Sequence, residues 1–271
     1  MSARRLAFGL LCGMAGLAMA GDSPGLSSGQ SQSAGSTSYS ELKASVKDGK
    51  YGVETLRDIL RKPDMTQGLR PNEERAVLNE VMDGLCRSEN ADSPFEDLLM
   101  AVALDPDRDP GVREYAVQHL LLWHAKTERK AKVEDCLWKC AEEPVLSAGA
   151  ILQLHHLAMR TKGGLSRPLA PVLMASLARP RLRNSDRITL ILVAAERRVR
   201  DALPYARNWA EEAPDRVLLS ASLTAIGKLG GSDDLAFLTA LEGRRNLDDV
   251  RKTLESARAR LGAGTVKGVK P

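Results

Sequence analysis

The chain has 271 residues and a formal net charge of +4, and aromatic residues make up only 4% of it. Nucleic-acid-binding proteins are expected to carry a large basic excess for phosphate neutralisation, so this near-neutral balance predicts no nucleic-acid partner. Leu, Ala, Arg and Glu, which are good helix formers, dominate the composition. The alternation of Val, Ile and Thr that is typical of strands is missing, and we therefore expect an all-α fold.

Residues 1–20 have the pattern of an export signal peptide. Arg4 and Arg5 precede an apolar run over residues 6–17, and a small-x-small site ends at Ala20. The run is shorter than the roughly 20 apolar residues that a membrane span needs. A twin-arginine signal is the weaker alternative, because the residues after the arginine pair do not have its spacing. We expect cleavage near Ala20 and an extracytoplasmic mature chain, periplasmic or secreted, without a transmembrane segment.

The composition divides the rest of the chain into three parts. Residues 21–40 are rich in Ser, Gly and Gln, and such a segment buries too little apolar surface to offset its ordering entropy, which predicts a flexible linker. A helical repeat domain is expected over residues 41–262. Residues 263–271, which include Gly, Val and Lys, are predicted to be a disordered tail.

Apolar residues spaced three and four apart predict helices throughout the repeat domain. An irregular capping helix is expected over residues 41–61. Ser93, Pro94 and Glu96 have the pattern of a helix start, with a capping serine, a first-turn proline and an acidic third residue. The first helices of successive hairpins are expected to begin near residues 72, 110, 145, 185, 215 and 247. These intervals overlap the periods of helical repeat proteins, about 33 to 47 residues.

Each first helix is predicted to pair with the helix that follows it in an αα-hairpin. The helix that begins at Asp109, for example, is paired with the one over Val133 to Cys140. The last helix, Leu247 to Leu261, has no return helix after it and is predicted to cap the stack. The predicted fold is therefore an α-solenoid of about five helical hairpins plus capping helices.

Two stretches resemble a known family. They are the Asp-Pro-x-Val-Arg-x-x-Ala-x-x-x-Leu pattern over Asp109 to Leu120, and the Leu-Gly-Gly-Ser-Asp-Asp-Leu run that leads to Val250 and Arg251. Both are similar to HEAT repeats of the short bacterial kind, and the resemblance covers roughly residues 72–261. Tetratricopeptide repeats share the period, but their Trp, Gly-Tyr and Ala-Phe positions are not matched.

The HEAT resemblance implies a right-handed superhelix with a concave face, and most often a binding protein rather than an enzyme. In that family, aspartates and arginines of successive repeats form a ladder between layers. The resemblance therefore implies structural roles for Arg113 and Arg251, paired with acids such as Asp109 and Asp249.

The cysteine spacing favours a structural role. Cys136 and Cys140 fall on one apolar helical stripe, so we interpret them as small buried hydrophobic residues. A strained disulfide is the alternative, because a helical spacing of four places the Cα atoms about 6 Å apart. Cys86 would then be left over, which is an awkward count for a disulfide framework.

His155, His156 and Trp138 are the candidate partner-binding residues. Neighbouring residues on a helix diverge by about 100°, so one of the two histidines is expected to face solvent. No histidine pair has the spacing of three or four that favours a metal site on one helix, and we predict no metal and no cofactor. Trp138 lies off the cysteine stripe, so its ring is expected at the surface or against a neighbouring repeat.

No pattern in the chain assembles a catalytic group. There is no Gly-x-Ser-x-Gly elbow and no glycine-rich phosphate loop, so we predict that the protein is not an enzyme. The leading hypothesis is an exported, non-catalytic scaffold that binds another protein or peptide of the cell envelope. The alternative is a small-molecule- or metal-handling accessory protein that uses His155 and His156. Basic clusters at 179–187 and 197–200 are interpreted as solvated faces or as cations paired with helix C-termini.

Overall fold

A computed structural model of the chain describes residues 39–62, 66–88, 94–127, 130–161, 163–244 and 246–266. The predicted export signal, residues 21–38 of the predicted linker and residues 267–271 of the predicted tail lie outside these ranges. Every element of the described ranges is helical, which confirms the all-α prediction. No helix in these ranges is long and apolar enough to span a membrane.

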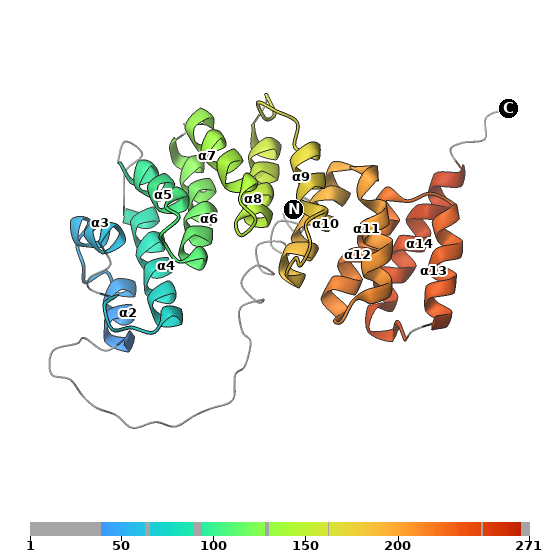
Figure 1. Cartoon of the computed structure of the whole chain (residues 1–271), viewed down its shortest axis with the longest axis horizontal. Helices are drawn as coiled ribbons and strands as arrows, with labels where there is room; N and C mark the ends of the chain where they lie inside the picture. The colour runs from blue at the N-terminus through green and yellow to red at the C-terminus, as the bar shows by residue number, and fades with distance from the viewer. Residues whose placement is uncertain are drawn as a thin grey trace, which may run out of the picture. The chain divides into compact units, whose positions relative to one another are not determined.

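The helices form two rows that follow the chain order (Figure 1). The even-numbered helices are α2 (Tyr39–Lys47), α4 (Pro71–Ser88), α6 (Pro110–Thr127), α8 (Ser147–Arg160), α10 (Asn184–Arg197), α12 (Arg216–Leu229) and α14 (Arg251–Val266). The odd-numbered helices are α3 (Val53–Arg61), α5 (Phe95–Leu104), α7 (Lys130–Glu142), α9 (Ala170–Leu177), α11 (Leu203–Glu212) and α13 (Asp233–Arg244). Short 3-10 helices at Arg200–Ala202 and Asp248–Val250 precede α11 and α14.

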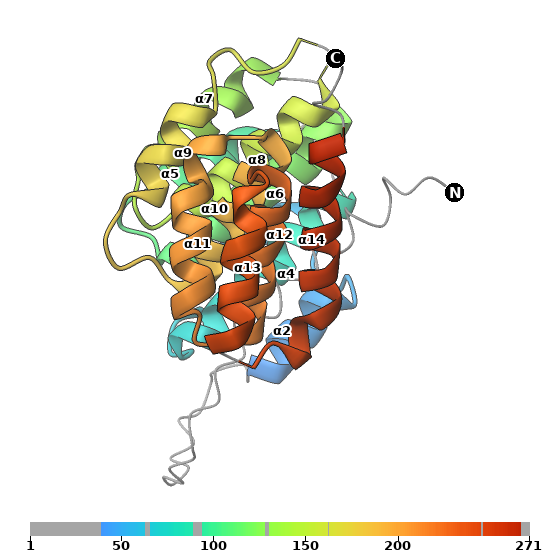
Figure 2. The ribbon, with the colours of Figure 1, turned by 90° about the vertical axis from the view of Figure 1, so that its right-hand side faces the viewer.

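Each even-numbered helix packs against the next, from α2 through to α14, and we call these helices the even row. The odd-numbered helices cover the other side, and Figure 2 shows α9 and α11 on one side of the array and α14 on the other. This stacking of sequential helices against their neighbours confirms the predicted all-α solenoid architecture.

The pairing frame, that is, which odd helix pairs with which even helix, differs from the predicted one. Helix α5 packs extensively against α6, α7 against α8, and α11 against α12, so each odd helix pairs mainly with the even helix that follows it. The helix that begins at Pro110 was expected to pair mainly with the helix after it, and this is wrong. Caps and periodicity predict where the helices start. They do not predict which neighbour packs against an even helix, because both flanks of each even helix are apolar.

The last helix lies at the end of the stack, as predicted. Helix α14 packs against α12 and also against α13, and no helix follows it in the described residues. It continues to Val266, beyond the predicted domain boundary at residue 262, with Gly262 and Gly264 inside the helix. At the other end, α2 begins at Tyr39, just before the predicted boundary at residue 41.

The core lies between the two rows and is built from aliphatic side chains with a few large aromatic ones. Phe95 and Trp123 are fully buried and meet edge to face, with ring centroids 5.1 Å apart. Aspartates fix where two even helices begin. Asp215 accepts hydrogen bonds from the backbone N–H groups of Val217 and Leu218, both at 2.9 Å, at the start of α12. Asp109 caps α6 in the same way.

Arginine side chains connect one pair of helices to another by capping helix C-termini. Arg108 donates to the carbonyl oxygens of Leu60 and Arg61 at the end of α3, at 3.1 and 2.7 Å. Arg179 donates to the carbonyl oxygen of Glu142 at 2.9 Å, and Arg198 to that of Lys228 at 2.8 Å. The last carbonyls of a helix have no partner within the helix and carry negative partial charge, so these contacts satisfy and neutralise them. Arg179 and Arg198 belong to the two predicted basic clusters, whose interpretation as C-terminal caps they support.

Candidate interaction surface

One face of the even row points away from the odd helices. Residues two, six, nine and thirteen of an α-helix share a face, because successive residues advance by 100°. In α6 these residues are Gly111, Tyr115, Gln118 and Leu122, all partly or fully exposed. Residues on the opposite side of the same helix, such as Leu120, are buried. We call the surface formed by these four positions across the even row the even face.

Two large apolar side chains are exposed at the same position of neighbouring even helices. Leu122 is the thirteenth residue of α6 and Met159 the thirteenth of α8, and they are 55% and 66% exposed. Such residues are usually buried, so two of them in register on packed helices mark a surface that another molecule could cover. The sequence analysis missed them, although their separation of 37 residues equals the separation of Pro110 and Ser147, where the two helices begin.

Charged residues take the same position on the other even helices. Asp83 is the thirteenth residue of α4, Glu196 that of α10 and Lys228 that of α12. The Lys228 ammonium group forms an ion pair with the Glu196 carboxylate, which joins α10 to α12. The thirteenth residues are therefore apolar on α6 and α8 and charged on α4, α10 and α12.

Helix α8 is recessed between its neighbours. Its even-face residues Leu152 and His155 are 8% and 6% exposed, whereas the matching residues of α6 and α10 are only half-buried. Lys228 of α12, two even helices further on, still acts electrostatically on His155. Neighbouring groups therefore cover the even-face residues of α8 more fully, except for the exposed Met159.

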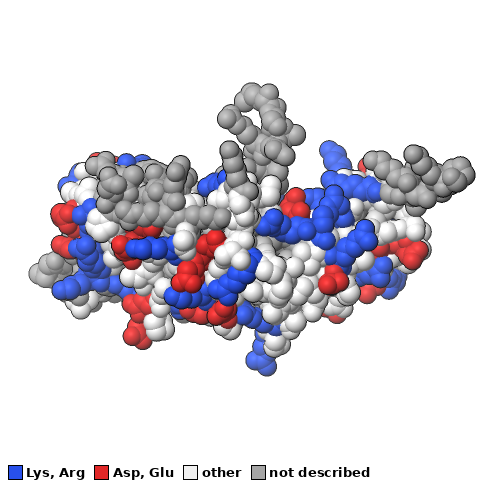
Figure 3. All heavy atoms as spheres, turned by 90° about the horizontal axis from the view of Figure 1, so that it is seen from above, with Lys and Arg blue, Asp and Glu red and all other residues white. Residues whose placement is uncertain are grey.

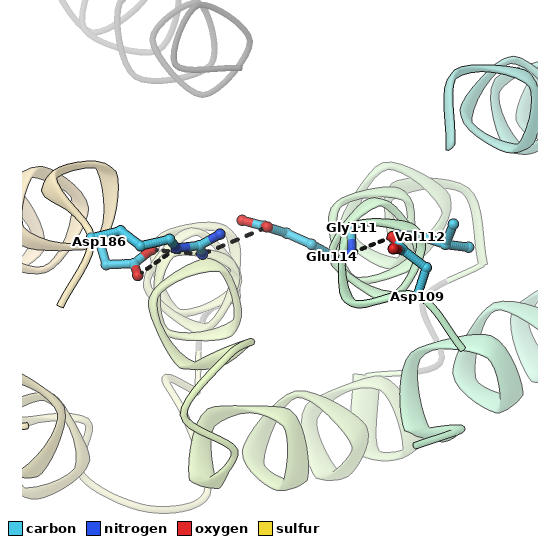
Figure 4. A network of polar contacts seen from close by, with 6 residues as sticks. Asp109, Gly111, Val112, Glu114 and Asp186 are labelled. Atoms are coloured by element: carbon cyan, nitrogen blue, oxygen red, sulfur yellow. Dashed lines mark hydrogen bonds and ion pairs between the residues drawn. The ribbon is translucent and has the colours of Figure 1, made fainter. Parts of the chain in front are cut away.

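A salt bridge closes over the start of α8 (Figure 4). Arg183, immediately before α10, approaches the Glu114 carboxylate of α6 at 3.8 Å and forms two hydrogen bonds with Asp186, at 2.8 and 2.9 Å. Glu114 passes over Gly149, where an added Cβ atom would lie 3.7 Å from the Glu114 Cγ atom. Burial raises the pKa of Glu114, and the nearby Arg183 guanidinium opposes this shift. This bridge holds α6 and α10 in place on either side of α8.

Both candidate histidines are buried, so the expectation that one faces solvent is wrong. The rings of His155 and His156 lie 5.6 Å apart, and α8 is enclosed by α6 on one side and α10 on the other. Burial, followed by the charges of His156 and Arg197, lowers the pKa of His155 to about 4. Burial and the Arg160 charge lower the pKa of His156. Both imidazoles are therefore neutral at pH 7.

Trp138 is fully buried, so its ring does not lie at the surface, which was one of the two predicted places. Its Nε1 atom donates to Glu134 Oε1 at 3.2 Å, and the Arg167 guanidinium lies 4.8 Å from the ring centroid. Glu134 also accepts hydrogen bonds from the backbone N–H and the hydroxyl of Ser166. The segment between α8 and α9 therefore folds back over Trp138 and covers it.

Arg113 and Arg251 form ion pairs, but with other acids than the predicted ones. Arg113 donates to both carboxylate oxygens of Glu143 at 2.7 Å and to the carbonyl oxygen of Ala103 at 3.0 Å, and does not pair with Asp109. Arg251 pairs with Asp248, one residue before the predicted Asp249. Asp109 is used as the cap of α6, so its carboxylate faces the helix N-terminus rather than Arg113. Arg113 thereby ties the end of α5 to the segment after α7.

Cys136 and Cys140 are buried free thiols, as the apolar stripe predicted, and Cys86 is a third. A hydrogen bond between the pair raises the pKa of Cys136 and lowers that of Cys140. Within the described ranges, no group of three or more His, Cys, Asp or Glu side chains is placed to hold a metal ion. The metal-handling hypothesis stays a prediction without a structural candidate.

Charges of both signs are mixed on the surface. Lys and Arg side chains lie beside Asp and Glu side chains over much of the side shown in Figure 3. This mixture agrees with the near-neutral net charge. The electrostatic interactions of this surface are mainly those between neighbouring opposite charges.

Compared with known proteins, the chain matches no family model, no curated protein and no solved structure.

Proposed function

We propose that this chain is an exported, HEAT-like, non-catalytic scaffold that binds another protein of the cell envelope through its even face. The observation that carries the proposal is the exposure of Leu122 and Met159 in register on α6 and α8. Full burial of such a side chain stabilises a complex by roughly 1.5 to 3 kcal/mol. Protein interfaces commonly combine an apolar centre with a polar rim, and Asp83, Glu196 and Lys228 supply such a rim here.

The structure changes which residues the proposal assigns to the contact. Trp138, His155 and His156 are all enclosed by the protein itself. They support the surface from below, while Leu122 and Met159 form it. The bridge between Glu114 and Arg183 supports the same surface by fixing the neighbours of α8.

Site-specific photocrosslinking in the native envelope fraction tests the proposal. A photoreactive residue is placed at Leu122 or Met159, and at Lys139 on α7 of the odd row as a matched control with an exposed side chain. We expect one protein to be captured from both even-face positions and not from position 139. Its capture from position 159 should be lost when Leu122→Asp is added, without a change in thermal unfolding.

Two outcomes would count against this function. Equal capture from all three positions would show that the contact is nonspecific, and capture from none would remove the scaffold. The export part of the proposal has a separate readout, which is the N-terminal residue of the mature chain. Cleavage after Ala20 should leave Gly21 as the first residue.

A further inference from the structure

All four histidines of the chain are buried, and they lie on two neighbouring even helices. His119 and His124 belong to α6, and His155 and His156 belong to α8, with exposed fractions of 6 to 7%. Burial disfavours the charged form of an imidazole, whereas in water mild acid charges it, because the ordinary pKa of histidine is about 6.5. The histidines of the chain are therefore concentrated in the middle of the even row, where a charge is disfavoured.

The surroundings of His155 oppose a positive charge. Its Nδ1 atom is buried without a hydrogen-bond partner among the described residues, so a proton on this atom would have no acceptor. The ring of His156 lies 5.6 Å away and would carry the same charge in acid. Two cations, Arg197 and Lys228, and one anion, Glu196, act on His155 from α10 and α12. Charging His155 within the closed structure is therefore unfavourable.

The other helices packed against α8 carry charged groups that are already paired. Glu114 of α6 pairs with Arg183 over the start of α8, six residues before His155. Helix α9 contains no charged residue. The described charged side chains of α7 pair as follows: Lys132 with Asp97, Glu134 with Trp138 and Ser166, Asp135 with Lys139, and Glu142 with Arg167.

His119 and His156 respond to acid in the same direction as His155. Burial lowers the pKa of His119, although its hydrogen bond to the Tyr115 carbonyl oxygen, 2.8 Å long, and the charge of Asp83 on α4 oppose this shift. Burial and the charge of Arg160 both lower the pKa of His156. The compensation at His119 places most of the acid response on α8.

Each exposed apolar residue of the even face lies one helical turn from a buried histidine. Leu122 follows His119 by three residues, and Met159 follows His155 by four. Residues at these spacings are neighbours on a helix surface. Each unit of a stacked array contacts only its neighbours, so one helix can open locally while the ends stay folded. Opening of α8 would therefore move Met159 away from Leu122.

We propose that the even face is gated by pH. The face is closed and binds its partner while the buried histidines are neutral, and α8 opens and releases the partner when mild acid charges them. The inference rests on the proposed function and names the regulation of the same surface. The pKa of His155 is about 4 in the closed form against an ordinary 6.5, so its contribution to the closed form is present above pH 6.5 and is lost as the pH falls towards 4. Glu114 opposes the gate, because its raised pKa stabilises the closed form in acid.

Amide hydrogen exchange of the free chain at pH 7 and pH 5, corrected for the intrinsic exchange rates, tests the gate without a partner. The open population of α8 should rise roughly twentyfold between these pH values, because the open form binds a proton at His155 and the closed form does not. Helix α12, which has no histidine, should change much less.

Variants assign the rise to the histidines. The double variant His155→Leu, His156→Leu should remove most of it, and His155→Gln with His156→Gln repeats the test with polar side chains if the leucine variant does not fold. Ile151→Val, a buried control on the same helix, should raise exchange at both pH values and leave their ratio unchanged. Photocrosslinking from position 159 in the envelope fraction then tests release. The ratio of capture at pH 5 to capture at pH 7 should be low in the native chain and close to one in the double variant.

The outcomes separate this inference from the proposed function. An acid-induced rise in α8 that equals the rise in α12, or that survives both double variants, would overturn the inference. Loss of capture at pH 5 that the double variant does not prevent would place the pH dependence in the partner and would also overturn it. If the crosslinks at pH 7 persist in those cases, the scaffold function stands and only the gate is wrong. If α8 opens in acid as expected but nothing is captured at either pH, the envelope scaffold is wrong.

Discussion

Gly227 on α12 lies directly against the backbone of Ala257 on α14. A Cβ atom added at Gly227 would be 2.7 Å from Ala257 Cα and 2.9 Å from Ala257 Cβ, which is closer than carbon atoms approach without displacement. The two helices therefore cross at a point where only glycine fits between them. We expect Gly227→Ala to lower the free energy of unfolding by about 1 to 2 kcal/mol, because overpacking costs about 1 to 3 kcal/mol. The gain in helix propensity, up to about 1 kcal/mol, offsets only part of this.

Gly243 on α13 provides the control, because an added Cβ atom there would have no neighbour within 4 Å. Gly243→Ala should leave the free energy of unfolding unchanged or raise it by up to about 1 kcal/mol. Urea titration of both variants measures the contrast. Equal stability of the two variants would contradict the close crossing of α12 and α14.

The buried Arg113 side chain should be a major contributor to stability. Arg113→Ala leaves the buried Ala103 carbonyl without its donor, whereas the Glu143 carboxylate, 38% exposed, can be hydrated, so we expect a loss of about 1 to 3 kcal/mol. Arg251→Ala removes an exposed pair with Asp248, which water and salt screen, and should cost much less. Chemical unfolding at one pH compares the two variants, and a similar loss in both would argue against the burial of Arg113.

His155 should make stability depend on pH. Its pKa is about 4 in the folded chain against an ordinary value of 6.5, so the stability it provides is present above pH 6.5 and is lost as the pH falls towards 4. The full loss amounts to about 3 kcal/mol. His155→Leu should therefore lose less stability between pH 7 and pH 4.5 than the native chain does. Glu114 acts in the opposite direction because its pKa is raised, so the comparison of variant with native chain isolates the histidine.

Glu134 should control access to the segment between α8 and α9. Glu134→Ala removes the acceptor of the Ser166 and Trp138 hydrogen bonds and should free this segment from the surface of α7. We expect faster amide hydrogen exchange at Ser166 and Arg167 and a red-shifted tryptophan emission. Asp135→Ala, at an exposed position on the same helix, serves as the control. Unchanged hydrogen exchange at Ser166 and Arg167 in Glu134→Ala would show that other contacts hold the segment.

The sequence was sufficient for those features that depend on local chemistry. Asp109 and Asp215 cap helices because their carboxylates reach backbone N–H groups two and three residues away, and periodicity then follows each helix. The even face follows from the same periodicity once the helix starts are known. Leu122 and Met159 lie 12 and 14 residues after the predicted starts at 110 and 145, and they become equivalent only with the observed start of α8 at Ser147.

Features that depend on distant segments were not predictable in this way. Trp138 is covered by residues that come after α8. Arg113 of α6 pairs with Glu143, which follows the C-terminal end of α7. Local patterns place neither contact, because several acids lie at plausible distances along the chain. The pairing frame failed for the same reason: periodicity shows that α6 has two apolar flanks and does not show which neighbour covers more of them.

The pairing frame also determines where the chain can be divided. Cuts between α4 and α5, or between α6 and α7, leave complete pairs on both sides, whereas a cut between α5 and α6 separates two helices that cover each other. Arg108 still joins the α5–α6 connection to the end of α3, so even a fragment that starts at α5 loses one cross-link between neighbouring units. Minimal soluble fragments of this protein should therefore begin at an odd helix and end at an even one.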